Sequence, residues 1–253
     1  MFRVIYFTNK GNLRDTNEDS LLVFEKIISS TDMDKCESLN IDSRSILLAV
    51  ADGIGGNTKG ELASKIVLEV LQRYKEDIMT KKLSIEDAIK KARDELENYN
   101  RISPNSSGMG CTIAGILVVD SKLYIFNVGD CRVYRLLGPR IVKLTKDHTV
   151  VEELVSSGCI TVDEAKVHSK KHILTSAIVA DNHQTEIQIY KNETEIIDKD
   201  KFIICSDGFW EEFENEISQI FSTDDFCSEF QKRIQNKKLS DNISFILVTQ
   251  LLD

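Results

Sequence analysis

The chain of 253 residues contains only two prolines, Pro104 and Pro139, and no tract rich in proline, glycine or serine. Because linkers between domains are usually rich in such residues, the sequence predicts a single domain over residues 1–253. A chain of this length can bury roughly 70% of the surface that its unfolded form exposes. Its core therefore needs no disulfide or structural metal to be stable.

Cysteine is present but unpaired in sequence, since the six cysteines form no CxxC motif. Cys111 and Cys205 lie within apolar runs, where cysteine behaves as a small hydrophobic residue. This usage is typical of a reducing compartment. No signal peptide opens the chain, and no apolar run approaches the length of about 18 residues that a membrane span needs. We therefore expect a cytoplasmic protein without a membrane partner.

Positive charge is in deficit, because 32 basic residues face 41 acidic ones and the net charge is −9. Binding along a nucleic-acid backbone requires clustered cations, so we expect no nucleic-acid partner. The four histidines show no spacing typical of a zinc site. We also expect the protein to be a monomer.

Apolar runs rich in valine, isoleucine, leucine and phenylalanine predict strands. They lie at 3–8, 20–24, 45–51, 110–119, 122–128, 131–136, 141–145, 185–190, 201–206 and 243–251. Helical spacing of apolar residues predicts helices at 59–77, 84–101 and 224–237. Strands grouped mostly in antiparallel order, with helices between the groups, indicate an α+β fold.

Short signals refine this organisation. Ser84, with Asp87 three residues later, resembles a capping box at a helix start. Asp120 and Ser121 separate two predicted strands and indicate a tight hairpin. The polar stretch 25–44 is interpreted as a surface loop.

Four short acidic segments are spread over nearly the whole chain. They are Asn17-Glu18-Asp19, Asp52-Gly53-Ile54-Gly55-Gly56, Ser206-Asp207-Gly208 and Asp241-Asn242. Three of them lie where an apolar run ends or begins, and a carboxylate at a strand end is fixed in direction yet open to solvent. Carboxylates converging on one point repel each other unless a cation lies between them, and oxygen ligands favour Mg²⁺ or Mn²⁺ over zinc. Taken singly, each Asp-Gly pair is better explained as a turn.

Together these segments resemble the PPM, or type-2C, metal-dependent serine/threonine protein phosphatases. The resemblance runs from about Thr8 to Val248 and is strongest to the bacterial members. Further motifs that carry it are Gly11-Asn12-Leu13-Arg14, Gly108–Thr112, Asn127-Val128-Gly129-Asp130-Cys131-Arg132, Leu144-Thr145-Lys146-Asp147-His148 and Asp241-Asn242-Ile243-Ser244. The family's fold implies a four-layer α/β/β/α sandwich of two antiparallel sheets flanked by helix pairs. Residues 149–172 are similar to the mobile flap over the active site of bacterial members.

The resemblance also implies a site of two Mn²⁺ or Mg²⁺ ions, with a third, weaker ion in bacterial members. Asp52 matches the catalytic carboxylate that bridges both metals. The remaining positions that match metal-binding positions are Glu18, Asp19, Gly53 through its carbonyl, Asp130, Asp207 and Asp241. Arg14 matches the arginine that binds the substrate phosphate, a role that suits the planar fork of a guanidinium.

Several positions depart from the family pattern or have an ordinary structural interpretation. Ile54 stands where many eukaryotic members have a histidine proposed as the general acid, although bacterial relatives commonly carry an apolar residue there. Ser176 and Val179 lie near positions where an arginine and a glycine are typical. His148 is interpreted as a histidine that orders a loop, and Arg132 as a structural ion-pair partner.

The sequence therefore predicts a metal-dependent hydrolase that removes phosphate from phosphoserine or phosphothreonine in proteins. Its expected partners are phosphorylated proteins, including a serine/threonine kinase or the targets of that kinase. Two alternatives remain open. One is a catalytically silent member of the fold that acts as a regulatory binding module, and the other is a phosphatase of small phosphometabolites.

Overall fold

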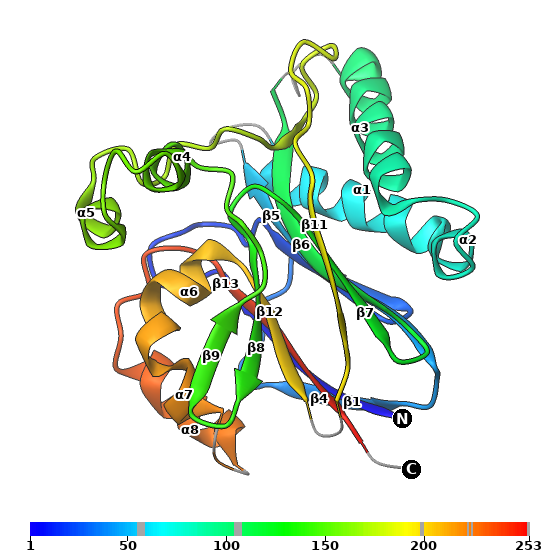
Figure 1. The fold of residues 1–253 in the computed structure, drawn as a ribbon. Helices are drawn as coiled ribbons and strands as arrows, with labels where there is room; N and C mark the ends of the chain where they lie inside the picture. The colour runs from blue at the N-terminus through cyan, green and yellow to red at the C-terminus, as the bar shows by residue number, and fades with distance from the viewer. Residues whose placement is uncertain (55–58, 104–107, 198–199, 222, 224, 252–253) are drawn as a thin grey trace.

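The computed structural model describes residues 1–54, 59–103, 108–197, 200–221, 223 and 225–251. Gly55 and Gly56, the last residues of the second acidic segment, lie outside this set. Two antiparallel sheets stack face to face, and helices cover the outer face of each sheet (Figure 1). This arrangement confirms the predicted four-layer α/β/β/α sandwich.

The first sheet contains both ends of the described chain in adjacent strands. Its order is β4 (Glu37–Ile41), β1 (Phe2–Asn9), β13 (Ile243–Gln250), β12 (Lys201–Cys205), β8 (Arg132–Leu137) and β9 (Arg140–Lys143). The outer face of this sheet carries α6 (Asp207–Phe213), a 3-10 turn η2 (Glu214–Glu216), α7 (Ile217–Ile220) and α8 (Phe226–Gln235). Every strand pair in it is antiparallel.

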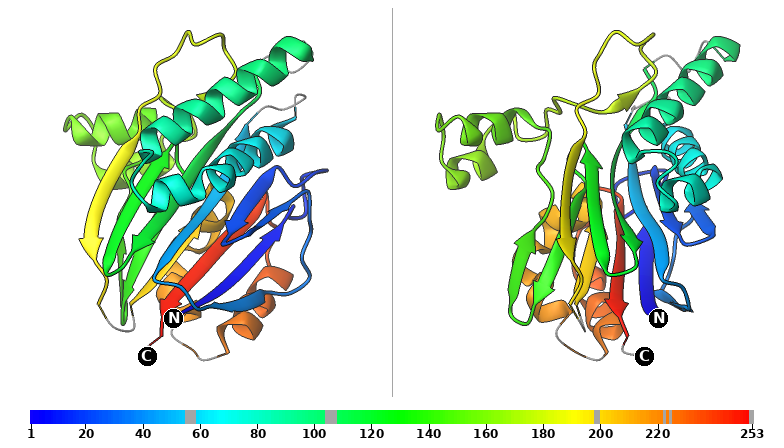
Figure 2. Two further views of the ribbon diagram at one scale, coloured as in Figure 1. Left: turned by 90° about the vertical axis from the view of Figure 1, so that its right-hand side faces the viewer. Right: turned by 45° about the vertical axis from the view of Figure 1, so that its right-hand side comes forward.

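The second sheet is built around one long central hairpin. Its order is β11 (Tyr190–Glu195), β7 (Lys122–Val128), β6 (Gly110–Val119), β5 (Ser45–Ile54), β2 (Asp19–Val23) and β3 (Lys26–Ser29), and the short β10 (Ile178–Val179) also pairs with β6. Its outer face carries α1 (Gly60–Arg73), α2 (Lys75–Met79) and α3 (Ile85–Ile102). Figure 2 shows α3 lying across this face.

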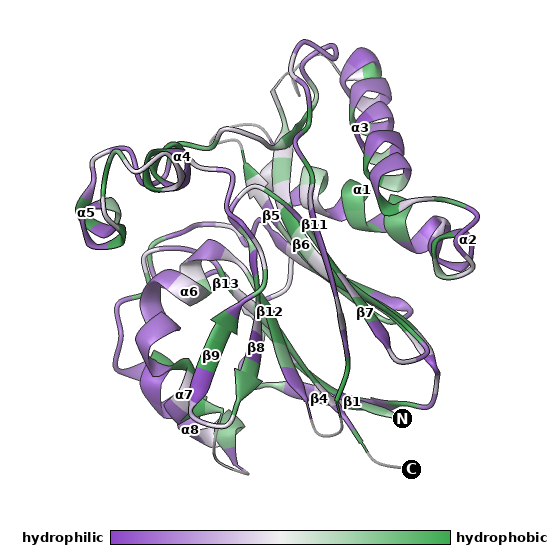
Figure 3. Cartoon of the chain, in the orientation of Figure 1, coloured by the Kyte–Doolittle hydropathy of each residue, from purple (hydrophilic) through white to green (hydrophobic). Residues whose placement is uncertain are grey.

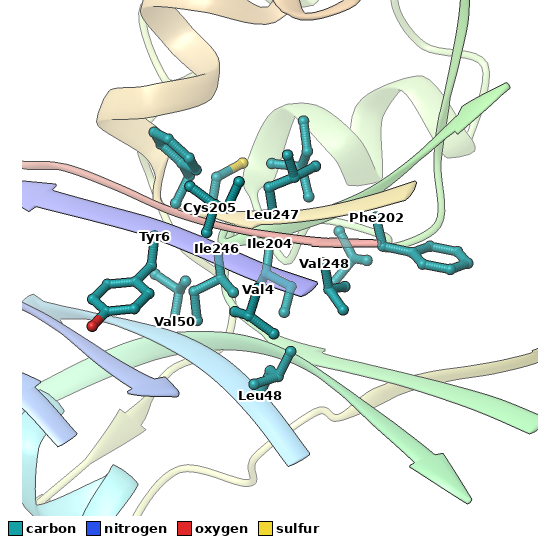
Figure 4. Close-up of a cluster of buried hydrophobic side chains, with 14 of the residues drawn as sticks. Val4, Tyr6, Leu48, Val50, Phe202, Ile204, Cys205, Ile246, Leu247 and Val248 are labelled. Atoms are coloured by element: carbon teal, nitrogen blue, oxygen red, sulfur yellow. The ribbon is translucent and has the colours of Figure 1, made fainter. Parts of the chain in front are cut away.

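Strand β5 shows how period-two patterning creates two cores. Ile46, Leu48 and Val50 point between the sheets, whereas the alternate residues Leu47 and Ala49 pack under α1 and α3. Figure 4 shows Leu48 and Val50 facing side chains of the first sheet. Because both faces of the strand are buried, its sequence is a continuous apolar run.

The helices follow their sequence signals closely. The Oγ of Ser84 accepts a hydrogen bond from the backbone N of Asp87 at 3.1 Å, which confirms the predicted start of α3. Apart from Glu97, the buried residues of α3 are alanine, isoleucine and leucine, and the exposed face of the helix is hydrophilic (Figure 3). Asp120 adopts a φ of 56° in the two-residue turn between β6 and β7, as the predicted hairpin requires.

The edges of the sheets depart from the sequence predictions. Residues 25–44, interpreted as a surface loop, contain β3 and the edge strand β4. The strand predicted at 185–190 is instead β11 at 190–195, a charged edge strand that pairs with β7 alone among the described residues. Apart from Ile41, no residue of these strands is fully buried, so they lack a buried face that would show a period of two in the sequence.

The helical segments also differ from the sequence predictions, because one predicted helix is divided and the helices that periodicity did not predict are short. The predicted helix 59–77 divides into α1 and α2 at Tyr74. Within 149–172 the chain forms α4 (Val150–Ser156) and α5 (Val162–Val167), which project away from the sandwich (Figure 1). None of the helices in the described ranges is long and apolar enough to cross a membrane.

Phenylalanine rings fill the space between the first sheet and its helices, and five of them meet around Phe230. Phe230 of α8 stands edge-on to Phe7 and Phe245, at centroid distances of 5.1 and 5.0 Å, and contacts Phe209 and Phe213 of α6. Such pairs add to the free energy of burial because the ring edges and faces carry opposite partial charges.

We expect Phe230→Ala to lower the free energy of unfolding by about 3–5 kcal/mol, because it removes a fully buried ring and leaves a cavity. Urea denaturation followed by circular dichroism measures this. Val167→Ala is the control, since Val167 is 85% exposed and should change stability by less than about 0.5 kcal/mol. Equal effects of the two changes would contradict this account of the core.

Candidate active site

The four acidic segments meet at one end of the seam between the two sheets. Asp19 at the start of β2 lies directly opposite Asp52 in the ladder of β2 and β5. Asp207 opens α6 directly after β12, and Asp241 lies two residues before β13. The side chains of Asp52 and Asp207 are hydrogen-bonded to each other across the seam. Carboxyl groups from both sheets therefore converge as the sequence predicts.

Burial and mutual repulsion raise the pKa of the carboxyl groups in this cluster. Burial is the largest cause for Asp52, followed by the charges of Asp207 and Asp19. Burial also raises the pKa of Asp207, and Asp241 adds repulsion. The pKa of Asp19 rises to about 7, chiefly through burial, although hydrogen bonds from two serines oppose the rise. Carboxyl groups whose pKa values are raised together in this way are oxygen donors that a cation would stabilise in their charged form.

A chain of hydroxyl groups fixes Asp19. Ser206 donates to the Oδ2 of Asp19 at 2.8 Å and accepts from the backbone N of Ser244 at 3.1 Å. The hydroxyls of Ser244 and Thr8 are 2.8 Å apart, and the side-chain amide of Asn17 donates to Thr8. The other oxygen of Asp19, Oδ1, is buried without a hydrogen-bond partner. That oxygen is free to bind a water or an ion.

Two glycines allow the backbone of β5 to approach α1. A Cβ on Gly53 would lie 2.3 Å from the backbone C and O of Gly60, and a Cβ on Gly60 would lie 2.9 Å from the Cδ of Glu18. The backbone N of Gly53 donates to the carbonyl of Glu18 at 3.1 Å, and Ser64 donates to the same carbonyl at 2.6 Å. Any side chain at position 53 would displace the helix.

Asn242 holds the segment that carries Arg14 and Glu18. Its Oδ1 accepts from the backbone N of Glu18 at 2.8 Å, and its amide donates to the carbonyls of Lys10 and Thr16. Asn242 is part of a sequence motif, but its role could not be predicted from that motif, because its hydrogen-bond partners lie near the other end of the chain. The amide therefore positions the loop rather than contributing a charge.

Arg14 reaches the acidic cluster at its open side. Its Nη2 donates to the Oδ2 of Asp241 at 2.7 Å, and its side chain is 51% exposed. This hydrogen bond raises the pKa of Arg14, and the charges of Glu18 and Asp52 contribute further. The guanidinium is therefore a cation placed between the carboxylates and solvent, where an anion can reach it.

Asp130 approaches the cluster from the turn before β8. It is 7% exposed, and its pKa is raised first by burial and then by the charges of Asp207 and Asp147. Its carbonyl accepts a hydrogen bond from the indole of Trp210 at 2.9 Å. The turn is thus anchored to α6, the helix that begins at Asp207.

Arg132 and His148 serve the structure as the sequence indicated. Arg132 forms a bidentate pair with Asp147, contacts Glu214, and lies 3.3 Å from the ring centroid of Trp210. The Nδ1 of His148 accepts from the backbone N of Gly129 at 3.0 Å. Since that nitrogen is already engaged, His148 orders the loop that carries Asp130.

The segment that departs from the family pattern is anchored by its own contacts. The Oγ of Ser176 exchanges hydrogen bonds with the backbone of Gln188, at 2.9 and 3.2 Å. Val179 lies in β10 and pairs with Gly110. Ile54 ends β5 opposite Gly110 and offers no proton donor beside Asp52 and Gly53.

The donor set fits a hard divalent cation. As the side chains lie, no group of three or more acidic, histidine or cysteine residues within the described ranges could hold a metal ion. Two contacts engage the carboxylates instead, namely Asp52 with Asp207 and Arg14 with Asp241. The free oxygen of Asp19 and the raised pKa values are nevertheless those of oxygen ligands lacking their counter-charge.

Comparison with known proteins agrees with this architecture. A family model described as protein phosphatase 2C matches residues 30–244. The chain is 29% identical over 254 residues to the serine/threonine phosphatase stp of Listeria monocytogenes, covering 95% of this chain and 93% of that protein. It is 32% identical over 164 residues to the serine/threonine protein phosphatase PstP of Mycobacterium tuberculosis, a match that spans only 31% of PstP.

Solved structures give the same result. The serine/threonine phosphatase Stp1 of Staphylococcus aureus superposes with a TM-score of 0.78 and 26% identity, covering 100% of this chain and 96% of that chain. The catalytic domain of PstP in complex with two manganese ions superposes with a TM-score of 0.75 over 98% of this chain and 99% of that chain, and at 23% identity it supports the fold alone. The fold is thus that of bacterial metal-dependent phosphatases. By the extent of the family match, the chain belongs to the protein phosphatase 2C family.

The raised pKa of Asp19 predicts how stability depends on pH once divalent cations are removed. The folded protein retains this proton up to about pH 7, whereas the unfolded chain releases it near pH 3.8, the ordinary pKa of an aspartate side chain. Between these values the folded state binds more protons, so the free energy of unfolding should fall as pH rises. Urea denaturation with excess chelator, at about pH 5 and about pH 8, measures the difference.

Asp19→Asn should reduce this pH dependence, because the amide does not titrate. Asp120→Asn, at the exposed hairpin turn, is the matched control and should leave the dependence unchanged. If the free energy of unfolding of the chelated protein increased with pH, burial would not be what sets the pKa of these carboxyl groups.

Proposed function

We propose that the chain is a metal-dependent protein phosphatase that hydrolyses phosphoserine and phosphothreonine, with residues 1–253 forming one catalytic domain. The observation that carries this proposal is the convergence of buried carboxyl groups from both sheets, with the partly exposed Arg14 beside them. The names of the relatives support a protein substrate, and their family supports dependence on a divalent cation.

The proposed ligands come from all four acidic segments. Asp52 would contribute to the binding of two Mn²⁺ or Mg²⁺ ions. The Gly53 carbonyl and Glu18 would hold one of them, with Asp19 acting through its waters, and Asp207 and Asp241 would hold the other. Asp130, from the turn before β8, would hold a third, weaker ion together with Asp207. When bound, such ions activate a water and neutralise charge on the phosphoryl oxygens.

The remaining residues position the substrate and limit the acid–base chemistry. Arg14 lies where its guanidinium can leave Asp241 and bind two oxygens of a phosphate. Ile54 supplies no proton, and the Nδ1 of His148 is occupied by the backbone of Gly129. The residue that follows Gly53 therefore offers no side chain that could protonate the leaving alkoxide.

Removal of divalent cations should abolish hydrolysis of an aryl phosphate and of phosphopeptides, and either Mn²⁺ or Mg²⁺ should restore it. Asp52→Asn should lower kcat by more than about 100-fold, because changes even outside the ligand shell of metal sites cost 10–100-fold. Asp120→Asn, at an exposed turn of the second sheet, should keep the parent rate. Undiminished turnover in excess chelator would rule out metal-dependent chemistry.

The same assay separates the alternatives. A regulatory binding module would show no turnover with any substrate at any metal concentration. A phosphatase of small metabolites would prefer phosphometabolites to phosphoserine and phosphothreonine peptides by kcat/KM.

Arg14→Ala should raise KM for a phosphopeptide about 10-fold, equivalent to about 1.4 kcal/mol of binding free energy, with a smaller change in kcat. This estimate is modest because the guanidinium is half exposed and therefore screened by solvent. Arg14→Lys should be intermediate, since it keeps the charge but loses the planar fork. Parent kinetics in Arg14→Ala would place the phosphate elsewhere.

A further inference from the structure

Two cysteines from distant parts of the chain meet on the side of the first sheet that faces α8. Cys36 directly precedes the edge strand β4, and Cys227 is the second residue of α8. Each thiol is the first influence on the pKa of the other, which places the two side chains beside each other. Both are partly exposed and both pack against the core cluster between the sheets and α6 to α8. Small solutes can therefore reach the pair from solvent.

A neighbouring hydrogen bond holds the two segments together independently of the thiols. The amide of Gln231, one turn further along α8, donates to the carbonyl of Asp34 at 2.8 Å. On the other side of Cys36, the hydroxyl of Tyr6 in β1 donates to Glu37 at 2.7 Å and so holds the start of β4 on the first sheet. The approach of Cys36 to Cys227 is thus part of the packed structure, and Figure 2 shows the β4 edge beside the orange α8.

The two thiols differ in acidity. The hydrogen bond from Cys36 lowers the pKa of Cys227, whereas the same bond and burial raise the pKa of Cys36. Cys227 also lies in the first turn of a helix, where the backbone dipole favours a thiolate. The pair therefore consists of a nucleophilic sulfur and a neighbouring thiol that can condense with it.

We propose that Cys36 and Cys227 form a redox modification site whose co-substrate is a hydroperoxide. The Cys227 thiolate attacks one oxygen of hydrogen peroxide, the O–O bond breaks, hydroxide leaves, and Cys227 becomes a sulfenic acid. The sulfur of Cys36 then attacks that of Cys227, the S–O bond breaks, and the departing hydroxyl leaves as water with the proton of Cys36. The product is a disulfide, with two electrons transferred from the thiols to the peroxide.

Each of the other cysteines lacks either exposure to solvent or a neighbouring thiol. Cys111, Cys131 and Cys205 are buried, and burial raises the pKa of each thiol. Cys159 in the projecting segment is exposed, and its sulfur accepts a hydrogen bond from the hydroxyl of Ser157 rather than from a thiol. Cys159 is therefore a matched control that peroxide can oxidise without forming this cross-link.

The disulfide would join two segments that lead to the candidate active site. Residues just before Cys36 bind the first sheet near the acidic cluster, because Asn17 donates to the carbonyl of Thr31 and Met33 donates to that of Thr8. Closing so long a loop restricts the unfolded chain strongly. Oxidised protein should therefore unfold at a temperature higher by about 10 °C than reduced protein.

The test treats purified full-length protein with hydrogen peroxide, blocks remaining thiols by alkylation, and maps peptides by mass spectrometry without reduction. The expected product is a cross-link of the Cys36 and Cys227 peptides, two hydrogens lighter than their sum and lost on reduction. Thermal denaturation with and without reductant measures the shift. Cys159→Ser should cross-link and shift as the parent does.

Single variants separate the two steps. Cys36→Ser should stop at the sulfenic acid of Cys227, trapped by a 1,3-diketone reagent, with no cross-link and no shift in unfolding temperature. Cys227→Ser should show neither the trapped adduct at Cys36 nor the cross-link. Peroxide that oxidises Cys159 while leaving Cys36 and Cys227 as free thiols would overturn the proposal, as would a sulfenic acid at Cys227 of the parent that never condenses.

Discussion

Electrostatic repulsion among a few buried carboxyl groups is the constraint on which the rest of this structure depends. Asp19 and Asp52 lie on paired strands of one sheet, and Asp207 opens α6 just after a strand of the other sheet, so regular structure fixes each of them. A less rigid frame would let these groups move apart into solvent. Two apolar cores, one between the sheets and one under α1 and α3, hold the strand ends in place.

The central strands and most of the candidate site could be predicted because their signals are local. Strand β5 is an unbroken apolar run that ends at Asp52, and α6 begins at Asp207 where such a run stops. Buried segments of this kind reveal both their conformation and their ends. The order of the motifs supplied the ligand assignments, which periodicity alone did not.

The features of the site that the sequence did not predict depend on contacts between residues far apart in the chain. The hydroxyl bridge of Thr8 to Ser244 joins strands at opposite ends of the chain, and nothing near either residue indicates the other. The pairing of Arg14 with Asp241 is equally remote in sequence. Edge strands such as β4 and β11 escaped prediction for another reason, since solvent replaces one neighbour and the apolar pattern fades.

Helices α4 and α5 contribute no buried side chain, although α5 has a complete capping box at Thr161 and Glu164. Their conformation is thus determined largely by local contacts, and α4 touches the sandwich through the ion pair of Glu152 with Lys143 of β9. Such a segment can be rewritten in evolution, or exchanged between relatives in a chimera, without disturbing a contact of either apolar core.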